Sequence, residues 1–155
     1  MKKYIGRLGV LGAVVMMLMA MFSAPAQAAA NPYTRFQACA GDFGGSWSDT
    51  TDGHRNVLTP SGSKWGDVYL MYNSATGYNC VVVLKSTYLG TSSRMVAGLL
   101  IQGESNWREE DDNFSYYATV QGPARDKCVQ YDGFIWSPSG ASRAHGARYS
   151  WGNCG

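Results

Sequence analysis

The chain contains few residues of the kinds that carry out acid–base or nucleophilic catalysis. Its two histidines are His54 and His145. A serine nucleophile needs a neighbouring base, and a Ser-His-Asp arrangement could combine His54 with Ser46 or Ser48 and with Asp49. The sequence lacks the Gly-x-Ser-x-Gly pattern that places a serine on a strained turn. We therefore favour the interpretation that both histidines lie in surface loops.

Carboxylates are more frequent, but no pair of them is marked as a site. The only charge cluster is Glu109–Asp112, whereas a calcium ion takes about six to eight spaced oxygens and the EF-hand loop also needs a glycine. Glycoside hydrolysis needs two carboxylates across a cleft, and nothing in their context distinguishes Glu104, Asp67 or Asp132 for that role. We interpret the cluster as a solvated loop and predict no catalytic residue, metal ligand or cofactor.

Tryptophan offers a different kind of chemistry, because an exposed ring can stack on a sugar or anchor a protein interface. Four tryptophans lie in or beside predicted loops: Trp47, Trp65, Trp107 and Trp136. The competing interpretation is that a small β domain buries these rings in its core. We take Trp65, Trp107 and Trp136 as the candidate binding surface.

Four cysteines restrict both the compartment and the fold: Cys39, Cys80, Cys128 and Cys154. An even number of cysteines in an exported chain predicts two disulfides, which leaves no free thiol for catalysis. Three pairings are open, and we favour the pairing of neighbours along the chain, Cys39 with Cys80 and Cys128 with Cys154. A zinc site is disfavoured, because there is no Cys-x-x-Cys and no paired histidine.

The first 28 residues have the pattern of a secretory signal peptide. Lys2, Lys3 and Arg7 are followed by the uncharged apolar run Leu8–Phe22, and Ala26–Ala28 forms an A-x-A cleavage pattern. The apolar run is shorter than the roughly 20 residues that a bilayer requires. We therefore expect cleavage after Ala28, with Ala30 as the alternative, and no stable membrane insertion afterwards.

Removal of this segment leaves about 127 residues, enough for one domain with one core. Three of the 13 basic residues leave with it, so the remaining chain is nearly neutral and lacks the basic surface of a nucleic-acid binder. We divide this single domain into an irregular N-terminal segment, residues 29–66, and a β-rich core, residues 67–155.

The residues from Asp67 onward have the composition and punctuation of short strands. β-branched and aromatic runs alternate with Gly, Pro, Asn and Ser turns, and the longest apolar run, within Tyr78–Lys85, predicts a central strand covered on both faces. Arg94–Gln102 also fits a helix, but the flanking glycines favour a strand. The predicted fold is all-β: a small antiparallel meander of about six strands, forming a sandwich or a partly closed barrel with two disulfides. The predicted strands are 68–72, 78–85, 94–102, 114–121, 127–136 and an edge strand at 147–151.

A set of short segments in the β-rich region and at both ends of the mature chain forms an ordered pattern. The segments are Asn31–Thr34, Tyr72–Ser74, Gly77–Val82, Leu84–Lys85, Leu89–Gly90, Ser115–Ala118, Gly122–Pro123, Lys127–Val129 and Cys154–Gly155. In their order and spacing these segments resemble the actinobacterial spore-associated protein family (spore-associated protein A-like). The pattern is more specific than any single short motif, and all four cysteines have counterparts in it.

The resemblance implies a small secreted protein at the spore or cell surface and supplies no catalytic residues. We therefore expect an extracellular, non-enzymatic protein whose partner is an envelope or spore-surface component, either polysaccharide or protein. The alternatives are a carbohydrate-binding module and an extracellular protease inhibitor, which would present Ser137–Arg148 as a braced loop. A hydrolase that uses His54 is the fourth hypothesis.

Overall fold

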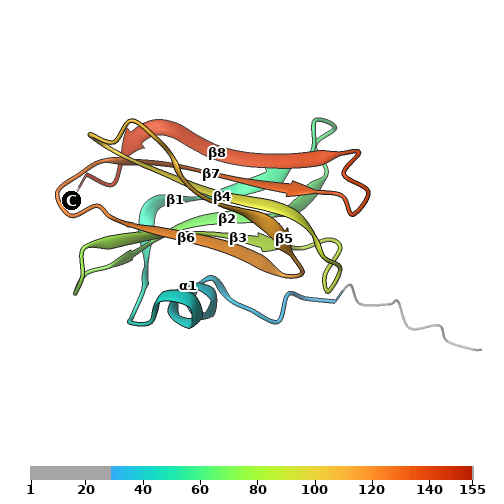
Figure 1. Cartoon of the computed structure of the whole chain (residues 1–155), viewed down its shortest axis with the longest axis horizontal. Coiled ribbons are helices and arrows are strands. Elements are labelled where there is room, and N and C mark those ends of the chain that lie inside the picture. Colours follow the sequence, from blue (N-terminus) through green and yellow to red (C-terminus); the bar gives the residue numbers. More distant parts are fainter. Residues whose placement is uncertain (1–28, 155) are drawn as a thin grey trace, which may run out of the picture.

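The computed structural model describes residues 29–154, so the predicted signal peptide, residues 1–28, lies outside the described residues. One helix and eight strands make up the described part of the chain (Figure 1). In the described region no helix combines the length and apolar character needed to cross a membrane. The elements are α1 (Arg35–Phe43), β1 (Ser48–Leu58), β2 (Lys64–Asn73), β3 (Tyr78–Lys85), β4 (Ser93–Ile101), β5 (Arg108–Phe114), β6 (Tyr117–Pro123), β7 (Val129–Trp136) and β8 (Arg143–Gly152).

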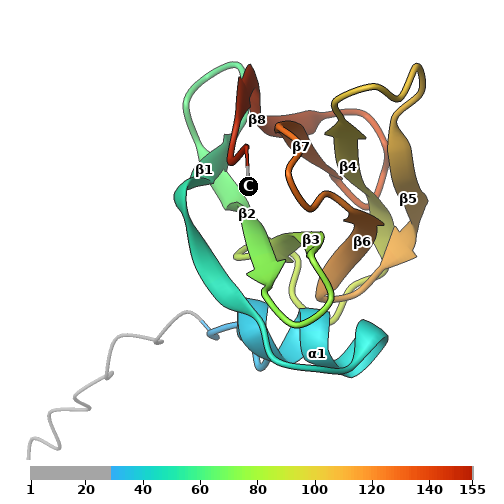
Figure 2. The same cartoon turned by 90° about the vertical axis from the view of Figure 1, so that its left-hand side faces the viewer.

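The eight strands form one antiparallel sheet in the order β5-β4-β7-β8-β1-β2-β3-β6. The sheet curls into a nearly closed barrel, in which β5 and β6 are the two end strands and face each other (Figure 2). β1 and β8 pair through a single residue pair, Leu58 with His145. This weak junction separates two four-stranded halves of the barrel, β5-β4-β7-β8 and β1-β2-β3-β6. The predicted all-β, antiparallel, partly closed architecture is thus confirmed.

The predicted number of about six strands is wrong, because two strands lie in segments without a strand pattern. Only Gly53 and Val57 of β1 are buried, so its Ser-, Thr- and Asp-rich sequence lacks the alternation of a half-buried strand. All residues of β5 before Phe114 are exposed, and continuous pairing with β4 makes this acidic segment a strand. The order is also not a simple meander, since β4 pairs with β7 rather than with β3.

Two further differences concern the two ends of the domain. The helix α1 was not predicted, although Thr34 and Gln37 form a capping box that defines its start. The predicted edge strand at 147–151 is part of β8, which begins at Arg143. β8 is not an edge strand, because it lies between β7 and β1 in the sheet. Arg94–Gln102 is a strand, as the flanking glycines indicated.

The barrel interior holds the main hydrophobic core. Most of its fully buried side chains come from alternate positions of β2, β3, β4 and β7, among them Leu70, Met95, Leu99 and Tyr131. A Cβ on Gly133 of β7 would lie 2.6 Å from a methyl group of Val83, so only glycine lets the two halves approach this closely. A second cluster on the outer face of β2 and β3 packs beneath α1, so β3 is covered on both faces as the sequence predicted. It lies next to the end strand β6, however, and not at the centre of the sheet.

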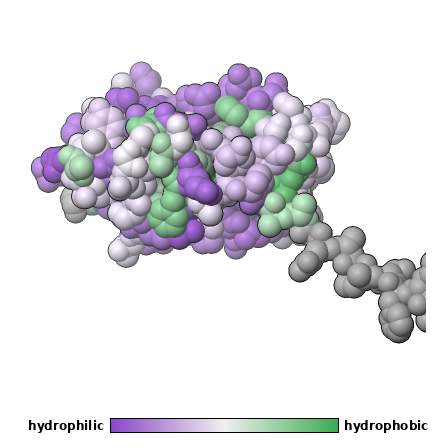
Figure 3. Space-filling view, turned by 90° about the horizontal axis from the view of Figure 1, so that it is seen from below, coloured by the Kyte–Doolittle hydropathy of each residue, from purple (hydrophilic) through white to green (hydrophobic). Residues whose placement is uncertain are grey.

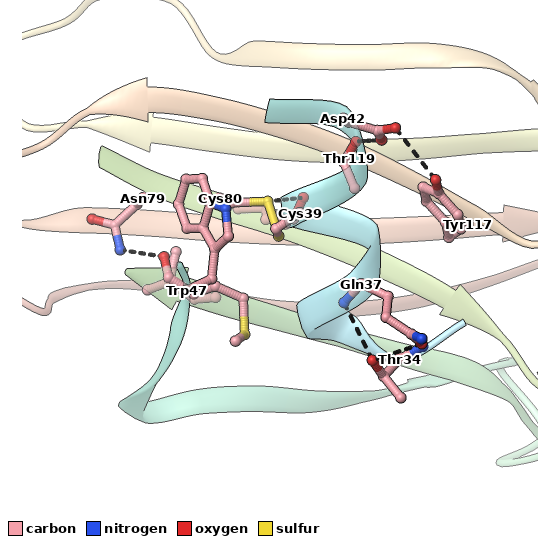
Figure 4. Close-up of a disulfide and its surroundings, with 12 residues drawn as sticks. Thr34, Gln37, Cys39, Asp42, Trp47, Asn79, Cys80, Tyr117 and Thr119 are labelled. Atoms are coloured by element: carbon pink, nitrogen blue, oxygen red, sulfur yellow. Dashed lines mark hydrogen bonds between the residues drawn. A yellow bond between two sulfur atoms is a disulfide. The ribbon is translucent and has the colours of Figure 1, made fainter. Parts of the chain in front are cut away.

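The two disulfides join the expected neighbours along the chain. Cys39 of α1 bonds to Cys80 of β3, with 6.3 Å between their Cα atoms (Figure 4). Cys128, just before β7, bonds to Cys154 at the C-terminal end of the described chain. The first bond holds α1 on the barrel, and the second holds the end of β8 beside the start of β7.

Removal of the Cys39–Cys80 bond should destabilise the protein strongly and should release α1. We expect the Cys39→Ala/Cys80→Ala variant to lose about 4 kcal/mol of unfolding free energy in the loop-entropy model, measured by urea denaturation. Amide exchange within α1 should become much faster, because the helix then lacks its covalent link.

Cys128→Ala/Cys154→Ala is the matched control, since its bond closes a loop of similar size. It should lose about 3.5 kcal/mol while α1 keeps its protection relative to global unfolding. Equal loss of protection of α1 in both variants would contradict the assigned role of the first bond.

Candidate functional site

The three tryptophans of the predicted binding surface do not form one cluster. Each is half-buried, but Trp65 packs on the main core and lies edge-on to Tyr88, with 5.2 Å between ring centroids. Trp107 and Trp136 are the two ends of a different row of rings on the outer face of the barrel. Two of the three predicted tryptophans, Trp107 and Trp136, therefore belong to one row of rings, and Trp65 lies outside it.

This row, which we call the aromatic ladder, consists of Trp107, Tyr149, His145, Phe134 and Trp136. Successive ring centroids are 5.9, 5.8, 4.4 and 5.7 Å apart, within the range of favourable aromatic pairs. The ladder arises because side chains alternate along a strand: the neighbours of Phe134 and Trp136 on β7 face the core, so these two rings face outward. His145 and Tyr149 of β8 share that outer face.

Two arginines lie over the Trp136 end of the ladder. The guanidinium carbon of Arg94 is 4.4 Å from the centroid of the Trp136 ring, and that of Arg143 is 5.4 Å from the centroid of Phe134. Arg94 also forms a bidentate pair with Asp111 on β5, whereas no ion pair joins Arg143 to a carboxylate within residues 29–154. This end of the ladder therefore combines flat apolar surface with an available positive charge.

A hydrogen-bonded chain lies under the middle of the ladder. The Tyr149 hydroxyl donates to Asp132 Oδ2 at 3.1 Å, and its oxygen lies 2.9 Å from His145 Nε2. Burial raises the pKa of Asp132 to about 6. Partial burial of its hydroxyl, together with the nearby Asp132 charge, raises the pKa of Tyr149 to about 12, and burial lowers that of His145.

Asp132 has the features of a buried support and not of a group that meets a substrate. Asp132 is only 6% exposed, and its Oδ1 atom has no hydrogen-bond partner among the described atoms. Both Oδ1 and the Trp107 ring lie against Gly98, where a Cβ would be 2.2 Å from that oxygen and 3.2 Å from the ring. The glycine on β4 thus makes room for the carboxylate, which in turn fixes the Tyr149 hydroxyl.

The ladder borders a shallow groove of about 400 Å³. One wall is formed by Phe134, Arg143, His145 and Tyr149, and the other by the end of β1 and the turn that follows it, residues 58–60. An adjacent groove contains Trp65 and shares Arg143 with the first. A ligand that lies along the ladder could therefore reach the side of Trp65 through Arg143.

The other predicted groups are not brought together into a catalytic site. The His54 ring bonds to Asp67 at 2.6 Å and stacks on Tyr69, while Asp49 pairs with Arg35. The Ser-His-Asp arrangement with Asp49 is therefore not assembled around His54. His145, predicted in a surface loop, is instead a half-buried member of β8.

The acidic run also differs from the predicted loop, because Glu109–Asp112 lies within β5 and its side chains alternate between two faces. No group of three or more His, Cys, Asp or Glu side chains that could hold a metal ion occurs in the described part of the chain. Sequence reasoning missed Phe134, His145 and Tyr149, although the period-two spacing of Phe134 and Trp136 does indicate that they share one face.

Asp132→Asn should stabilise the protein near neutral pH. Because the folded pKa of Asp132 lies above the unfolded value, the ionised carboxylate destabilises the fold above about pH 6, and this effect disappears as the pH falls to about 4. Asn keeps an oxygen that accepts from Tyr149, so we expect a gain of roughly 1–3 kcal/mol at about pH 7.5 and almost none at about pH 4. Urea denaturation at both pH values measures it.

The control is Asp111→Asn, because Arg94 holds the pKa of Asp111 below its usual value. Ionised Asp111 stabilises the fold above its unfolded pKa, so this variant should show no gain near neutral pH. The contribution of His145 to stability has the opposite pH dependence to that of Asp132, because burial lowers the pKa of His145. His145 is present in both variants, so this contribution is the same in each. A gain in Asp132→Asn that did not change with pH would contradict the assigned burial.

Comparison with known proteins gives one informative match. The chain is 44% identical over 77 residues to spore-associated protein A of Streptomyces coelicolor (strain ATCC BAA-471 / A3(2) / M145). The match covers 49% of this chain and 49% of the relative, so the chain spans about half the length of the curated relative it matches. No family model matches, and no solved structure matches. This similarity to spore-associated protein A covers about half of the chain and agrees with the resemblance of its sequence segments.

Proposed function

We propose that this chain is a secreted, non-enzymatic protein of the spore or cell-envelope surface that binds a surface polysaccharide through the aromatic ladder. The name of the relative, spore-associated protein A, supports the spore surface as the place of action. The signal-peptide pattern at residues 1–28 and the two disulfides support export. The ladder supplies the contact surface.

The observation that carries this proposal is the continuous row of rings between Trp107 and Trp136. Flat aromatic faces offer a large contact area at little conformational cost, and they suit the apolar faces of sugar rings. Successive centroids are less than 6 Å apart, so neighbouring units of a polymer could contact neighbouring rings. Arg143 at one end favours a polysaccharide that also carries carboxylate or phosphate groups.

The state of Asp132 supports a binding role over a hydrolytic one. A glycosidase needs two carboxylates that both reach the scissile bond. Asp132 has the raised pKa of a general acid, but Oδ1 is enclosed against Gly98 and Oδ2 accepts from Tyr149. Neither oxygen faces the groove beside the ladder as a free group, which makes the carboxylate a positioning element for Tyr149.

The protease-inhibitor alternative receives less support from the geometry. Half of the segment Ser137–Arg148 that would form the inhibitory loop belongs to β8, and only residues 137–142 form the turn before it. Arg148 is buried, and its guanidinium donates to backbone carbonyls and to Asn153. A six-residue turn leaves little length for insertion into an enzyme cleft.

Trp136→Ala tests the polysaccharide proposal. The wild-type protein should be retained on at least one of isolated envelope polysaccharide, peptidoglycan, chitin and cellulose, and Trp136→Ala should bind roughly tenfold more weakly, since an aromatic contact of this kind is worth about 1 kcal/mol or more. Co-sedimentation with the insoluble polymer measures the affinity.

Tyr88→Ala is the matched control, because Tyr88 is an exposed ring that pairs with Trp65 and with no member of the ladder. It should bind like the wild type. If the wild type is retained on none of these polymers, or if both variants bind equally, the polysaccharide proposal is wrong.

A further inference from the structure

A second groove, independent of the aromatic ladder, lies between α1 and the strands β5 and β6. It encloses about 450 Å³ and is lined by Tyr33, Asp42, Glu110, Phe114, Tyr116 and Tyr117 among others. Figure 3 views the face on which α1 lies and shows hydrophobic residues in green next to hydrophilic residues in purple. Apolar and hydrophilic residues thus lie next to one another on this side of the barrel.

The groove is acidic and has no compensating cation among its lining residues. Asp42 and Glu110 are its two carboxylates, and it contains no lysine, arginine or histidine. No ion pair links either carboxylate to a basic side chain within residues 29–154. Asp49, Asp111 and Glu104 each pair with an arginine instead, whereas Glu109, Asp112 and Asp126 also have no ion pair among the described residues.

Asp42 is held in place by neutral donors. The hydroxyls of Thr119 and Tyr117 on β6 donate to its two oxygens, at 2.5 and 3.3 Å (Figure 4). Because α1 is fixed to β3 by the Cys39–Cys80 bond, the carboxylate has a rigid support. Two neutral hydrogen bonds orient it without neutralising its charge, so it remains available to a cation.

Aromatic rings surround these carboxylates. The Tyr33 ring packs on Tyr117 at 4.9 Å and on Tyr116 at 5.6 Å between centroids, with the planes inclined by 69° and 58°. Because these three tyrosine rings are inclined to one another, both faces and edges of the rings border the groove. An ammonium group is attracted to the faces of such rings, and more strongly where water is partly excluded.

The combination selects an organic cation over a metal ion. Calcium requires about six oxygens, and this groove offers two carboxylates separated by apolar rings, with no metal-ligating cluster found in residues 29–154. We propose that the groove binds an alkylammonium group, which pairs with Asp42 and Glu110 while its alkyl chain packs on the tyrosines. The source could be a free amine or a lysine side chain of a polypeptide, which present the same chemistry.

Titration of the disulfide-intact protein with three probes tests this proposal: butylammonium, the neutral isostere butanol, and an acetylated, amidated Gly-Lys-Gly peptide. Butylammonium should perturb the tyrosine signals of the groove in NMR spectra in a saturable manner, and added salt should weaken its binding. Butanol should give no saturable effect. Saturation by the peptide identifies a lysine side chain as an acceptable source, and saturation by butylammonium alone identifies a free amine.

Glu110→Gln is the main variant, because Glu110 lies on an exposed strand where the change does not threaten folding. It should weaken butylammonium binding roughly tenfold, and Asp42→Asn, which keeps an acceptor for Thr119, should do the same. Glu109→Gln is the matched control on the opposite face of β5 and should bind like the wild type. Equal binding by all variants, equal effects of butanol, or no saturation by either ammonium probe would overturn the proposal, whatever the outcome for polysaccharides.

Discussion

The barrel remains open between β5 and β6, and much of the molecule is arranged around that opening. Residues opposite each other in an antiparallel pair share a face, so Arg108, Glu110 and Asp112 of β5 lie on the same face as Leu99, Ala97 and Met95 of β4. On β4 that face is core, but on β5 it carries charge and is exposed. Inward-facing charges prevent an edge strand from pairing further, so β5 ends the sheet and the groove forms beside it.

The opening has to be stabilised by contacts other than strand pairing. Lys85 at the end of β3 supplies one of them: its buried ammonium donates to the backbone oxygens of Thr91 and Phe114 and to the Ser93 hydroxyl. These bonds tie β3 to the start of β4 and the end of β5. The side-chain amide of Asn31 bonds to the backbone oxygens of Lys85 and Tyr116, which places the N-terminal segment against the same corner. Tyr33 then enters the groove from that segment.

The parts of the fold whose buried residues follow a simple period could be predicted from the sequence. The parts whose structure depends on pairing with neighbouring strands could not. β3 is apolar on both faces and was recognised as covered on both sides; α1 covers its outer face. β5 is acidic throughout, so only its neighbour β4 indicates a strand. α1 is short and contains a cysteine, a glycine and two aromatics, so its capping box was a weak signal against a composition that favours strands. The ladder could be predicted only in part. The alternation of Phe134 and Trp136 is local, whereas the alignment of Trp107 with Tyr149 depends on the pairing of β5 with β4, of β4 with β7 and of β7 with β8.

The two surfaces have opposite electrostatic character within a nearly neutral chain. The ladder presents Arg143 beside Phe134 and Trp136, and the groove presents Asp42 and Glu110 beside tyrosines. An aromatic surface with a fixed positive charge favours anionic ligands, whereas an aromatic surface with fixed negative charges repels anions and favours cations. The same physical elements, rings plus one sign of charge, therefore give the two faces different ligand preferences. Under the two proposals, the domain would bind ligands of different charge on separate faces, because one ligand does not compete for the site of the other.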